Sequence, residues 1–432
     1  MFALIDGNNF YVSCERVFQP RLNGRPVITL SNNDGCAIAR SNEARALGIK
    51  MGAPWFQIRH LEAAAGLVAL SANFALYGDM SGRMMSLAAD LGPTQEIYSI
   101  DESFVGLHGV GGDLTQRARA IRDRILQWTG IPCGVGIGPS KTLAKLANHI
   151  AKTAERKPGS YPNALATVCN LASLPASEMD ALYAATGVGE VWGVGHRIEH
   201  QLQEAGVSTA LDLARLSPSM VRDRWSVALA RTVRELQGEP CIRLDEAPAA
   251  KKQIACTRSF GHPITERSAL REAVAAFASR TAEKLRRQRS LAGQVYVFAH
   301  TSPFRPGPRF SRSLVIPLTR PSADTRVLIQ AAVRGITHLY QPGFQLTKAG
   351  VMLLDLMPDT VRQGELDFDR REPNDGTGLM AVLDAINARF GRDSIRVGSA
   401  GTGEAHRHGS MRQERLTPQY TTKWSDLPVA LA

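Results

Sequence analysis

Two adjacent carboxylates, Asp101 and Glu102, interrupt the largely apolar stretch EIYSIDESFVGL at residues 96–107. Aromatic, aliphatic and β-branched residues in such a run are typical of a β-strand. An ionised carboxylate buried without a partner costs several kcal/mol, and a second one beside it adds repulsion. A strand of the core would not carry this pair for packing alone, so the pair indicates a site that holds positive charge.

A third acid, Asp6, ends the apolar strand FALID and is followed by GNNFY. A single aspartate at a strand end is usually a turn or cap residue. Together with Asp101 and Glu102, however, it forms a set of hard oxygen ligands suited to two Mg²⁺ ions. Two such ions favour in-line displacement at phosphorus. Adjacent side chains of a regular strand point to opposite faces, so the strand must bend or turn at Asp101.

Elements that alternate between strand and helix surround these acids over residues 1–165. Strands are expected at FALID, PVITL, EIYSID with SFVGL, and CGVGIG, and helices over residues 113–128 and 140–152. This order matches a β-α-β-β-α-β domain. In the second helix, four polar residues share one face: Lys141, Lys145, Asn148 and Lys152. This basic face either serves phosphate binding or is simply solvated.

The remainder of the chain divides into further regions. Residues 166–240 predict short helices, because Pro and Gly interrupt them repeatedly. Residues 241–252 resemble a linker. Residues 253–356 predict a separate unit, with a helix over 267–289 and strands at QVYVFAH, RSLVIPL and AGVMLLDL. Residues 357–432 are polar and expected to be partly disordered. The fold class predicted from this pattern is a multidomain α/β (α+β) protein.

Composition narrows the function classes. With 432 residues, 44% of them hydrophobic and 21% charged, the chain has the make-up of an ordinary globular protein. No apolar run reaches the roughly 18 residues of a membrane span, and no signal-peptide pattern is present, so a cytoplasmic location is expected. The six cysteines show no disulfide or zinc spacing.

The net charge of +11 indicates a polyanionic partner. Much of the excess lies within residues 280–320, which hold nine Lys and Arg residues against the single acid Glu283. A run such as RxxxKxRRxR can also be a solvated helix face. The clustering of so many basic residues in a tenth of the chain favours phosphate binding.

Four long motifs carry a resemblance to a known family: FALIDGNNFYVSCE, SNNDGCAIARSNEARALGIKMGAPWF, EIYSIDESF and CGVGIGPSKTLAKLANHIAK. They resemble the signature blocks of Y-family translesion DNA polymerases, most closely those of the UmuC-like branch. The resemblance extends to YTTKWSDLP near the end of the chain. It implies error-prone copying of damaged DNA in the SOS response, without a proofreading exonuclease.

The resemblance also implies a right-hand architecture. A ferredoxin-like palm would occupy residues 1–165, with small fingers inserted at about 20–75. A thumb with a helix-hairpin-helix motif would follow at 166–240, and an α/β little finger at 253–356. The region 357–432 would be flexible and would contact partner proteins.

Site residues carry over position by position. Asp6, Asp101 and Glu102 match the family's metal-binding acids, with the carbonyl of Gly7 as a further ligand of the two Mg²⁺ ions. Tyr11, next to Phe10, matches the aromatic steric gate that collides with a ribose 2′-OH and so selects deoxynucleotides. Without the resemblance, Tyr11 would be read as a core tyrosine.

Two cations match contacts to the triphosphate of the incoming nucleotide. They are Arg45, whose guanidinium suits phosphate oxygens, and Lys152. Because AKTAERKPG is longer than the corresponding segment of many relatives, Lys157 competes with Lys152 for this role. Asn42 stands where many members have a phosphate-binding tyrosine, and no role is assigned to it.

DNA contacts are expected in the thumb and little finger. VWGVGHRIEHQLQEAGV, residues 191–207, fits the helix-hairpin-helix pattern, in which Gly193 and Gly195 let the backbone approach a phosphate. An ordinary tight helix pair is the alternative. TRSFG and TSPFRPGPRF resemble the family's template-gripping strands. The basic run adds three candidate phosphate contacts: Arg286, Arg287 and Arg289.

Partners other than primer-template DNA and dNTPs are implied by the C-terminal region. Gln363, Leu366 and Phe368 match the QxxLxF pattern of sliding-clamp ligands. Members of the UmuC-like branch work with a UmuD′-type dimer and are activated by a RecA filament with ATP. The same resemblance implies a nucleoid-associated protein with no membrane partner.

Two other functions stay open. One is a catalytically silent, polymerase-like subunit of a mutagenesis complex, although all three acids and Tyr11 are present. The other is a nucleotide cyclase or a different two-metal enzyme on a palm-like fold, which would need neither a hairpin thumb nor a basic third domain. Templated primer extension distinguishes these from a polymerase.

Overall fold

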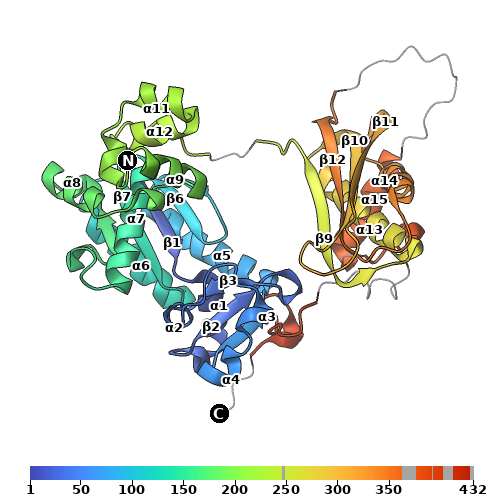
Figure 1. Cartoon of the computed structure of the whole chain (residues 1–432), viewed down its shortest axis with the longest axis horizontal. Coiled ribbons are helices and arrows are strands. Elements are labelled where there is room, and N and C mark those ends of the chain that lie inside the picture. The colour runs from blue at the N-terminus through green and yellow to red at the C-terminus, as the bar shows by residue number, and fades with distance from the viewer. Residues whose placement is uncertain (246–248, 362–375, 392, 402–411, 429–432) are drawn as a thin grey trace. The chain divides into compact units, whose positions relative to one another are not determined.

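The computed structural model describes residues 1–245, 249–361, 376–391, 393–401 and 412–428. The chain forms two compact units: residues 1–248 with 415–432, and residues 249–414 (Figure 1). Within the described residues, the first unit contains a five-stranded and a three-stranded sheet, the second contains a four-stranded sheet, and each unit has its own apolar core. None of the helices in the described stretches is long and apolar enough to cross a membrane.

A five-stranded sheet with the order β5-β6-β1-β7-β8 is the centre of the first unit. Its strands are β1 (Phe2–Gly7), β5 (Thr94–Ile97), β6 (Glu102–Gly106), β7 (Cys133–Gly138) and β8 (Val168–Asn170). Helices associated with the sheet are α1 (Phe10–Phe18), α5 (Phe74–Ala88), α6 (Leu114–Thr129) and α7 (Lys141–Arg156). The expected alternation of strands and helices is confirmed, and α7 continues four residues beyond its predicted end.

Residues 96–107 form a hairpin and not one continuous strand. Strand β5 ends at Ile97, β6 begins at Glu102, and the two strands pair antiparallel with Ile97 opposite Ser103. Asp101 is the last residue of the connecting turn. The expected bend or turn at Asp101 is therefore the point at which the chain enters β6.

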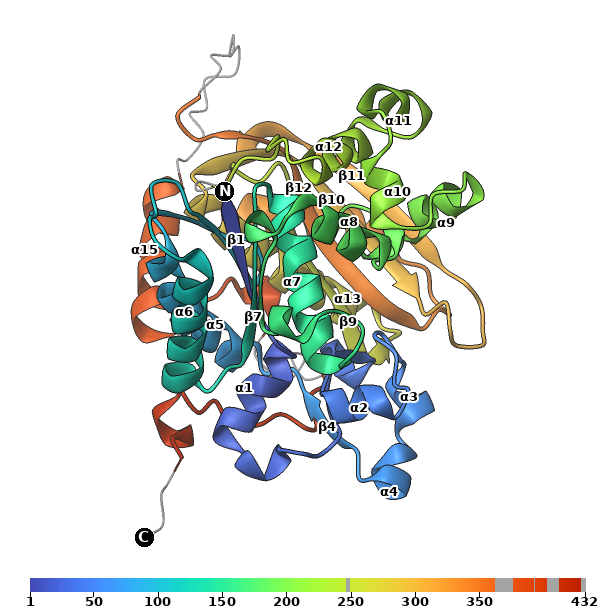
Figure 2. The same cartoon turned by 90° about the vertical axis from the view of Figure 1, so that its left-hand side faces the viewer.

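Glycines in β7 allow α7 to lie close to the sheet (Figure 2). A Cβ atom at Gly136 would overlap the carbonyl of Ala144 and the amide nitrogen of Asn148 in α7. The hydroxyl of Ser140 caps the helix by accepting the N–H of Leu143 at 3.2 Å. Close packing turns the polar face of α7 towards the sheet, so the alternative that this face is simply solvated is wrong.

The predicted insertion after α1 forms a small three-stranded sheet with the order β3-β2-β4. Its strands are β2 (Val27–Leu30), β3 (Ala37–Arg40) and β4 (Val68–Ser71), and its helices are α2 (Asn42–Ala46), α3 (Trp55–Ile58) and α4 (Leu61–Ala65). This sheet has a small core of its own around Ile28, Leu30 and Leu67.

Short helices follow β8, as the sequence predicts: α8 (Ala176–Ala184), α9 (His196–Glu204), α10 (Ala210–Ala214), α11 (Pro218–Arg224) and α12 (Val227–Leu236). The chain then remains attached to the first unit through buried carboxylates. Glu235 accepts the N–H groups of Cys241 and Ile242 at 3.0 and 2.8 Å, and Glu96 accepts that of Asp245 at 2.7 Å.

The second unit has a four-stranded sheet with the order β11-β10-β12-β9. Its elements are β9 (Ile254–Ile264), α13 (Arg267–Arg287), β10 (Ser290–Thr301), β11 (Ser311–Ser322), α14 (Thr325–Leu339), β12 (Leu346–Pro358) and α15 (Thr377–Phe390). Figure 1 shows the helices on one face of this sheet. Helix α13 ends two residues earlier than predicted.

Two stretches of the C-terminal region are ordered parts of the fold. Helix α15 packs on the second unit, where Met380 is buried, and residues 415–428 belong to the first unit. The expectation of flexibility does not hold for these stretches. The clamp-type motif Gln363, Leu366 and Phe368 lies outside the described residues and stays a prediction.

Candidate active site

The register of β1 and β6 brings two of the three acids together. Asp6 and Glu102 are directly opposite each other on the antiparallel strands. Asp101 precedes Glu102 in the turn, where its carbonyl accepts the N–H of Gly7 at 2.9 Å. Its carboxylate accepts a hydrogen bond from the hydroxyl of Ser99 at 2.6 Å. The turn thus fixes Asp101 beside the end of β1.

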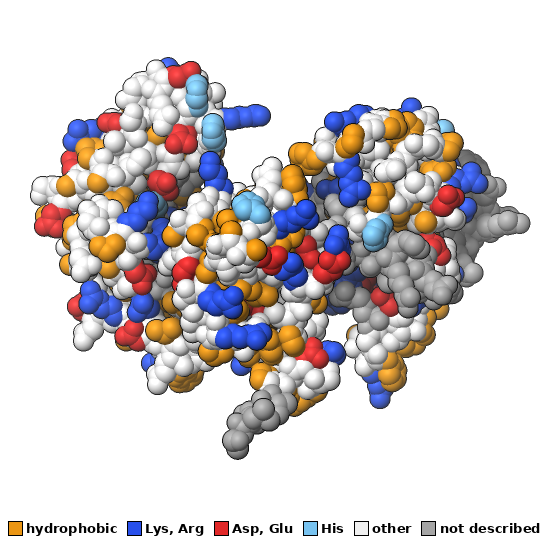
Figure 3. Space-filling model, turned by 60° about the horizontal axis from the view of Figure 1, so that its bottom comes forward, with side chains coloured by type: hydrophobic (Ala, Val, Ile, Leu, Met, Phe, Trp, Pro, Cys, Tyr) orange, Lys and Arg blue, Asp and Glu red, His pale blue; other side chains and the backbone are white. Residues whose placement is uncertain are grey.

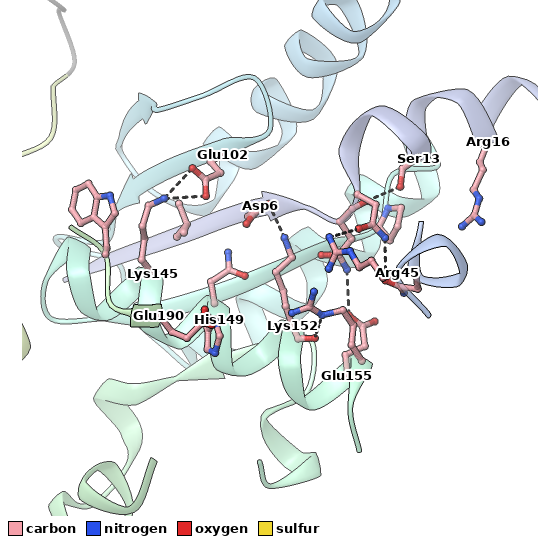
Figure 4. A pocket seen from close by; sticks show the side chains of 18 residues that line it. Asp6, Ser13, Arg16, Arg45, Glu102, Lys145, His149, Lys152, Glu155 and Glu190 are labelled. Carbon is pink, nitrogen blue, oxygen red and sulfur yellow. Dashed lines mark hydrogen bonds and ion pairs between the residues drawn. The ribbon is translucent and has the colours of Figure 1, made fainter. Parts of the chain in front are cut away.

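Each of the two facing acids is paired with a lysine of α7 (Figure 4). Lys152 Nζ lies 2.7 Å from Asp6 Oδ1, and Lys145 Nζ lies 3.0 Å from both carboxylate oxygens of Glu102. These side chains are between 16% and 20% exposed, so water screens the pairs only in part. The lysines supply the positive charge that the acids require in this structure.

Burial dominates the electrostatics of Asp6. Burial is the largest cause, Lys152 opposes it, and the neighbouring acids Glu102 and Asp101 add to it, so that the pKa of this carboxyl is raised to about 6. A further cation close to this carboxyl group would stabilise its ionised form. The site therefore favours the binding of positive charge next to Asp6.

A cavity of about 510 Å³ opens onto the two acid–lysine pairs. Its lining also includes Arg45 and Arg156, so cations and carboxylates meet across one space. Several buried polar atoms of its lining have no hydrogen-bond partner among the described residues: Asn8 Oδ1, Arg45 Nε and both amide atoms of Asn148. Polar groups left in this way are suited to a polar, charged ligand.

The three acids are neighbours, but the described residues contain no group of three His, Cys, Asp or Glu side chains gathered closely enough to hold a metal ion. Asp6 and Glu102 face the cavity, whereas Asp101 is engaged with Ser99. The donor set nevertheless fits Mg²⁺, because it consists of hard carboxylate oxygens in partly buried positions.

Phe10 and Tyr11 begin α1 directly after this site. Phe10 is buried, and its ring is so close to Gly7 that a Cβ atom there would meet it at 2.9 Å. Tyr11 is half-buried, and its ring stacks on Tyr77 with 4.5 Å between the centroids and 14° between the planes. The ring of Phe74 lies edge-on to both tyrosines, with its centroid 6.1 Å from that of Tyr11 and 6.3 Å from that of Tyr77. Tyr11 is therefore held in a defined orientation.

Asn9 and Asn42 connect α1 to Arg45, and sequence reasoning missed this network. Asn9, in a left-handed conformation with φ 48°, accepts a hydrogen bond from Arg45 Nη2 at 2.8 Å and donates one to Asn42 Oδ1 at 3.2 Å. The GNN sequence after Asp6 was the available signal, because Asn tolerates this conformation better than most residues.

Lys152 and Lys157 are the two candidates for the contact to the triphosphate. Lys152 lines the cavity and forms an ion pair with Asp6. Lys157 is the exposed residue after α7, and its N–H caps the helix on Thr153. Arg156 is the cation from this end of α7 that joins Lys152 in the cavity lining, and the sequence did not single it out.

The glycines of the predicted hairpin stand at the start of α9. Gly193 has a φ of 92°, which favours glycine, and Gly195 is the N-cap residue of the helix. No atom lies within 4 Å of a Cβ built on Gly195, so its surface is open to a large ligand.

Arg286 has intramolecular partners. It makes two hydrogen bonds of 2.7 Å to the carboxylate of Asp384 in α15, and it also bonds to Ala323 O and Thr325 Oγ1. Arg287 is exposed but pairs with Glu283 at 2.6 Å, and Arg289 is exposed. Arg286 thus holds α15 on α13, which the sequence could not reveal because Asp384 is far away in the chain.

The face of the second sheet away from its helices carries a ladder of rings. Tyr296, Phe298 and His300 alternate along β10 with the buried Val295, Val297 and Ala299, and neighbouring ring centroids lie 6.0 and 5.9 Å apart. TRSFG lies within β9, and TSPFRPGPRF forms the β10–β11 connection with Phe304 almost fully exposed.

Charges on the outer surface are mixed. On the face seen in Figure 3, Lys and Arg side chains alternate with Asp and Glu and do not form one basic field. The Lys and Arg residues that line the cavity come from three helices: Lys145, Lys152 and Arg156 from α7, Arg45 from α2, and Arg16 from α1.

Comparison with protein-family models gives three matches. The impB/mucB/samB family matches residues 5–149, its C-terminal domain matches residues 251–366, and a domain of unknown function matches residues 377–430. The first match covers the three acids, the small three-stranded sheet and the first nine residues of α7.

Similar proteins match over the whole length. The chain is 44% identical to protein ImpB and 43% identical to protein UmuC, both of Salmonella typhimurium, over at least 99% of each chain. It is 31% identical to DNA polymerase IV of Moorella thermoacetica, over 94% of this chain and 97% of that one. Among solved structures, it resembles a chimeric Y-family DNA polymerase with a TM-score of 0.64 at 18% identity, over 83% of this chain and all of the other. An insertion ternary complex of Dbh DNA polymerase has the same coverage and identity, with a TM-score of 0.52.

Proposed function

The chain belongs to the impB/mucB/samB family of Y-family DNA polymerases, and from this premise we propose that it performs error-prone translesion DNA synthesis in the SOS response. Its substrates in this proposal are primer-template DNA and dNTPs, and it joins each nucleotide to a primer 3′-OH without proofreading. The observation that carries the proposal is the register of Asp6 opposite Glu102, with Asp101 in the adjoining turn, at a cavity lined by cations.

Asp6, Asp101, Glu102 and the carbonyl of Gly7 are the groups that we assign to two Mg²⁺ ions. Burial of Asp6 and the oxygen-only donor set support this assignment. When bound, the ions would stabilise the charge on the attacking hydroxyl and the leaving phosphate. Lys145 and Lys152 neutralise the acids in the ligand-free protein, which lowers the cost of keeping them buried.

Arg45 and Lys152 are the cations that we assign to the triphosphate. Both line the cavity, and Arg45 is oriented by Asn9. A guanidinium held in this way presents its N–H groups in a fixed fork, which suits phosphate oxygens. The exposed position of Lys157 makes it the weaker candidate.

Tyr11, next to the buried Phe10, is the residue that we assign to sugar selection. Stacking on Tyr77 holds the ring of Tyr11, so a 2′-hydroxyl that met the ring would be rejected without rearrangement. This rigid contact supports the steric-gate role.

DNA binding is proposed at two places. In the thumb, the backbone at Gly193 and Gly195 would contact a phosphate without reading sequence. In the second unit, the exposed Arg287 and Arg289 remain proposed phosphate contacts. The uncovered ring ladder of the sheet offers a second surface, with Lys348 opposite His300.

Partner binding rests on the family alone. A sliding clamp would take the motif with Gln363, Leu366 and Phe368, and a UmuD′-type dimer and a RecA filament would join the active complex. A cytoplasmic, nucleoid-associated location follows from a DNA substrate. The alternative is a catalytically silent subunit, against which the three acids, Tyr11 and the cation-lined cavity argue.

Primer extension past an abasic site tests the function. The full-length chain is supplied with Mg²⁺, dNTPs and primed template, and the candidate partners are added one at a time. Template-dependent extension that disappears in the Asp101→Ala, Glu102→Ala double variant supports the proposal. No extension under any combination would favour the silent subunit, and template-independent turnover of a nucleoside triphosphate would favour a different two-metal enzyme.

A further inference from the structure

The C-terminal strap, residues 415–420, is a distant part of the sequence that crosses the first unit (Figure 2). It lies within the match to the domain of unknown function. At its start, the N–H of Ser71 donates to Arg415 O and the N–H of Arg415 donates to Ser71 Oγ, both at 3.0 Å. The start of the strap is thus bonded to the last residue of β4 in the small three-stranded sheet.

Side chains at both ends of the strap hold it in place. Arg415 makes two hydrogen bonds to Glu62, at 2.5 and 3.1 Å, and its guanidinium lies 4.9 Å from the ring centroid of Trp55. Tyr420 stacks on Phe18 at the end of α1, with 4.7 Å between the centroids and 7° between the planes. The strap therefore connects α3 and α4, the helices beside the small three-stranded sheet, to the end of α1.

The centre of the strap enters a buried polar cluster. Asn73 Nδ2 donates to Thr417 Oγ1 at 3.1 Å, and to the carbonyls of Thr417 and Pro418 at 3.2 and 3.0 Å. Thr417 Oγ1 in turn donates to Glu15 Oε1 at 3.1 Å. Asn73, Thr417 and Glu15 are 2%, 7% and 0% exposed, so water cannot replace these bonds.

Tyr77 links this cluster to the proposed steric gate. It is fully buried, its hydroxyl donates to Glu15 Oε1 at 2.7 Å, and its ring is the one on which Tyr11 stacks. Glu15 and Tyr11 are one turn apart on α1, so Tyr77 bridges both. Glu15 Oε2 has no partner within the described residues, so the donors on Oε1 hold the carboxylate.

We propose that Thr417, Glu15 and Tyr77 are positioning residues for sugar selection, which gives this part of the domain of unknown function a role in the polymerase reaction. The strap fixes Glu15, Glu15 fixes the hydroxyl of Tyr77, and the ring of Tyr77 fixes Tyr11. The inference rests on the proposed function of Tyr11. It places a determinant of substrate choice at the far end of the sequence.

The test uses the full-length protein with its partners and compares the kcat/KM values for a dNTP and the matching rNTP. Thr417→Val keeps the shape of the side chain and removes its hydroxyl, whereas Thr417→Ser keeps the hydroxyl. Thr421→Val is the matched control, because Thr421 Oγ1 is buried and has no hydrogen-bond partner among the described residues. The loss of one hydrogen bond corresponds to a change of about fivefold in the ratio of these two kcat/KM values.

We expect Thr417→Val and Tyr77→Phe to lower the dNTP preference by about fivefold while the kcat/KM for the dNTP changes less, with Thr417→Ser and Thr421→Val close to the parent. If Thr417→Val does not fold, Asn73→Ser provides a second route. Serine preserves the N-cap of α5 that Asn73 provides, and it removes the donors to the strap.

The Tyr11→Ala variant distinguishes the role of the strap from the role of Tyr11 itself in sugar selection. Relaxed sugar selection in Tyr11→Ala with unchanged selection in Thr417→Val, Tyr77→Phe and Asn73→Ser would overturn the role of the strap alone. Unchanged selection in Tyr11→Ala, or the absence of polymerase activity in the parent, would overturn both the strap's role and the assignment of Tyr11.

Discussion

At the scale of residues, the candidate site is built on carboxylates that face each other across two strands and are paired with lysines of α7. Three acids on or beside apolar strands stand out because buried carboxylates need counter-charge. Their actual partners, Lys145 and Lys152, were visible only as a helix face, because the sequence does not say which side of α7 meets the sheet. Asn9 was missed because its role depends on Arg45, which a different element supplies.

Replacing Lys152 or Lys157 by Ala shows which of the two lysines contacts the triphosphate. Lys152→Ala should raise the KM for dNTPs by about tenfold or more, because it removes a charged hydrogen-bond donor from the cavity. Lys157→Ala is the matched control and should behave as the parent. Steady-state incorporation of a single nucleotide measures both, and the reverse ranking would assign the triphosphate contact to Lys157.

Tyr11→Ala should admit ribonucleotides at least about tenfold more readily, because the aromatic wall against the 2′-OH is lost. The measurement is the ratio of kcat/KM values for a dNTP and the matching rNTP. Trp128→Ala, which removes an exposed aromatic ring of α6, is the control and should keep the sugar discrimination of the parent. If sugar discrimination in Tyr11→Ala equals that of the parent, Tyr11 is a packing residue only.

Glu15 should contribute measurably to the pH dependence of folding stability. Burial raises the pKa of its carboxyl from 4.5 to about 6, so the folded state keeps a proton that the unfolded state releases. Stability from this group is complete below pH 4.5 and is lost as the pH rises through 6. Glu15→Gln should therefore reduce the fall in stability between pH 4 and 7 by about 2 kcal/mol.

Unfolding of the parent and Glu15→Gln across this pH range provides the measurement. Glu178→Gln, at an exposed position in α8, is the control. Taking the difference between each variant and the parent removes the contribution of Asp6, whose pKa is also raised. Equal pH profiles for the parent and Glu15→Gln would contradict the raised pKa.

At the scale of elements, periodicity predicted most strands of the palm and of the second unit, together with helices α6, α7 and α13. It did not predict α1, α5 or α14. The glycines at alternate positions of CGVGIG give α7 the room to approach the sheet closely. The stretch at 96–107 was read as a strand with a bend or turn at Asp101, because apolar residues continue through it. The antiparallel pairing of β5 with β6 shows that the chain reverses its direction there. Helix α15 was hidden in a polar region, since it depends on contacts such as Arg286 with Asp384.

DNA binding by the second unit is testable through its salt dependence. If Arg287 and Arg289 contact phosphates, replacing both by Ala should flatten the log–log slope of affinity against salt by about one unit for each contact. Arg286→Ala should mainly reduce stability, because Asp384 loses its partner. Fluorescence anisotropy with primed DNA measures the slope.

Lys348→Ala on the sheet is the comparison variant for this measurement. An unchanged slope in the Arg287, Arg289 double variant, combined with a flatter one in Lys348→Ala, would move the DNA to the ring-bearing face of the sheet. The thumb would then share the duplex with that sheet face and not with α13.

At the scale of the whole molecule, the chain passes from the first unit to the second and returns at residue 415. Composition and periodicity cannot predict this return, because contacts such as Asn73 with Thr417 join positions 344 residues apart. Residues 415–428 consequently belong to the first unit, which also holds the three acids.

The central claim is that Asp6, Asp101 and Glu102 drive nucleotide transfer. Asp101→Asn tests it most directly, because the change removes metal-binding charge and leaves the proposed DNA contacts untouched. Single-nucleotide incorporation should fall below about 1% of the parent, with DNA affinity nearly unchanged by anisotropy. Asp180→Asn, on the exposed surface of α8, should retain full activity. An Asp101→Asn protein that extends primers at more than about 1% of the parental rate would contradict the two-metal assignment.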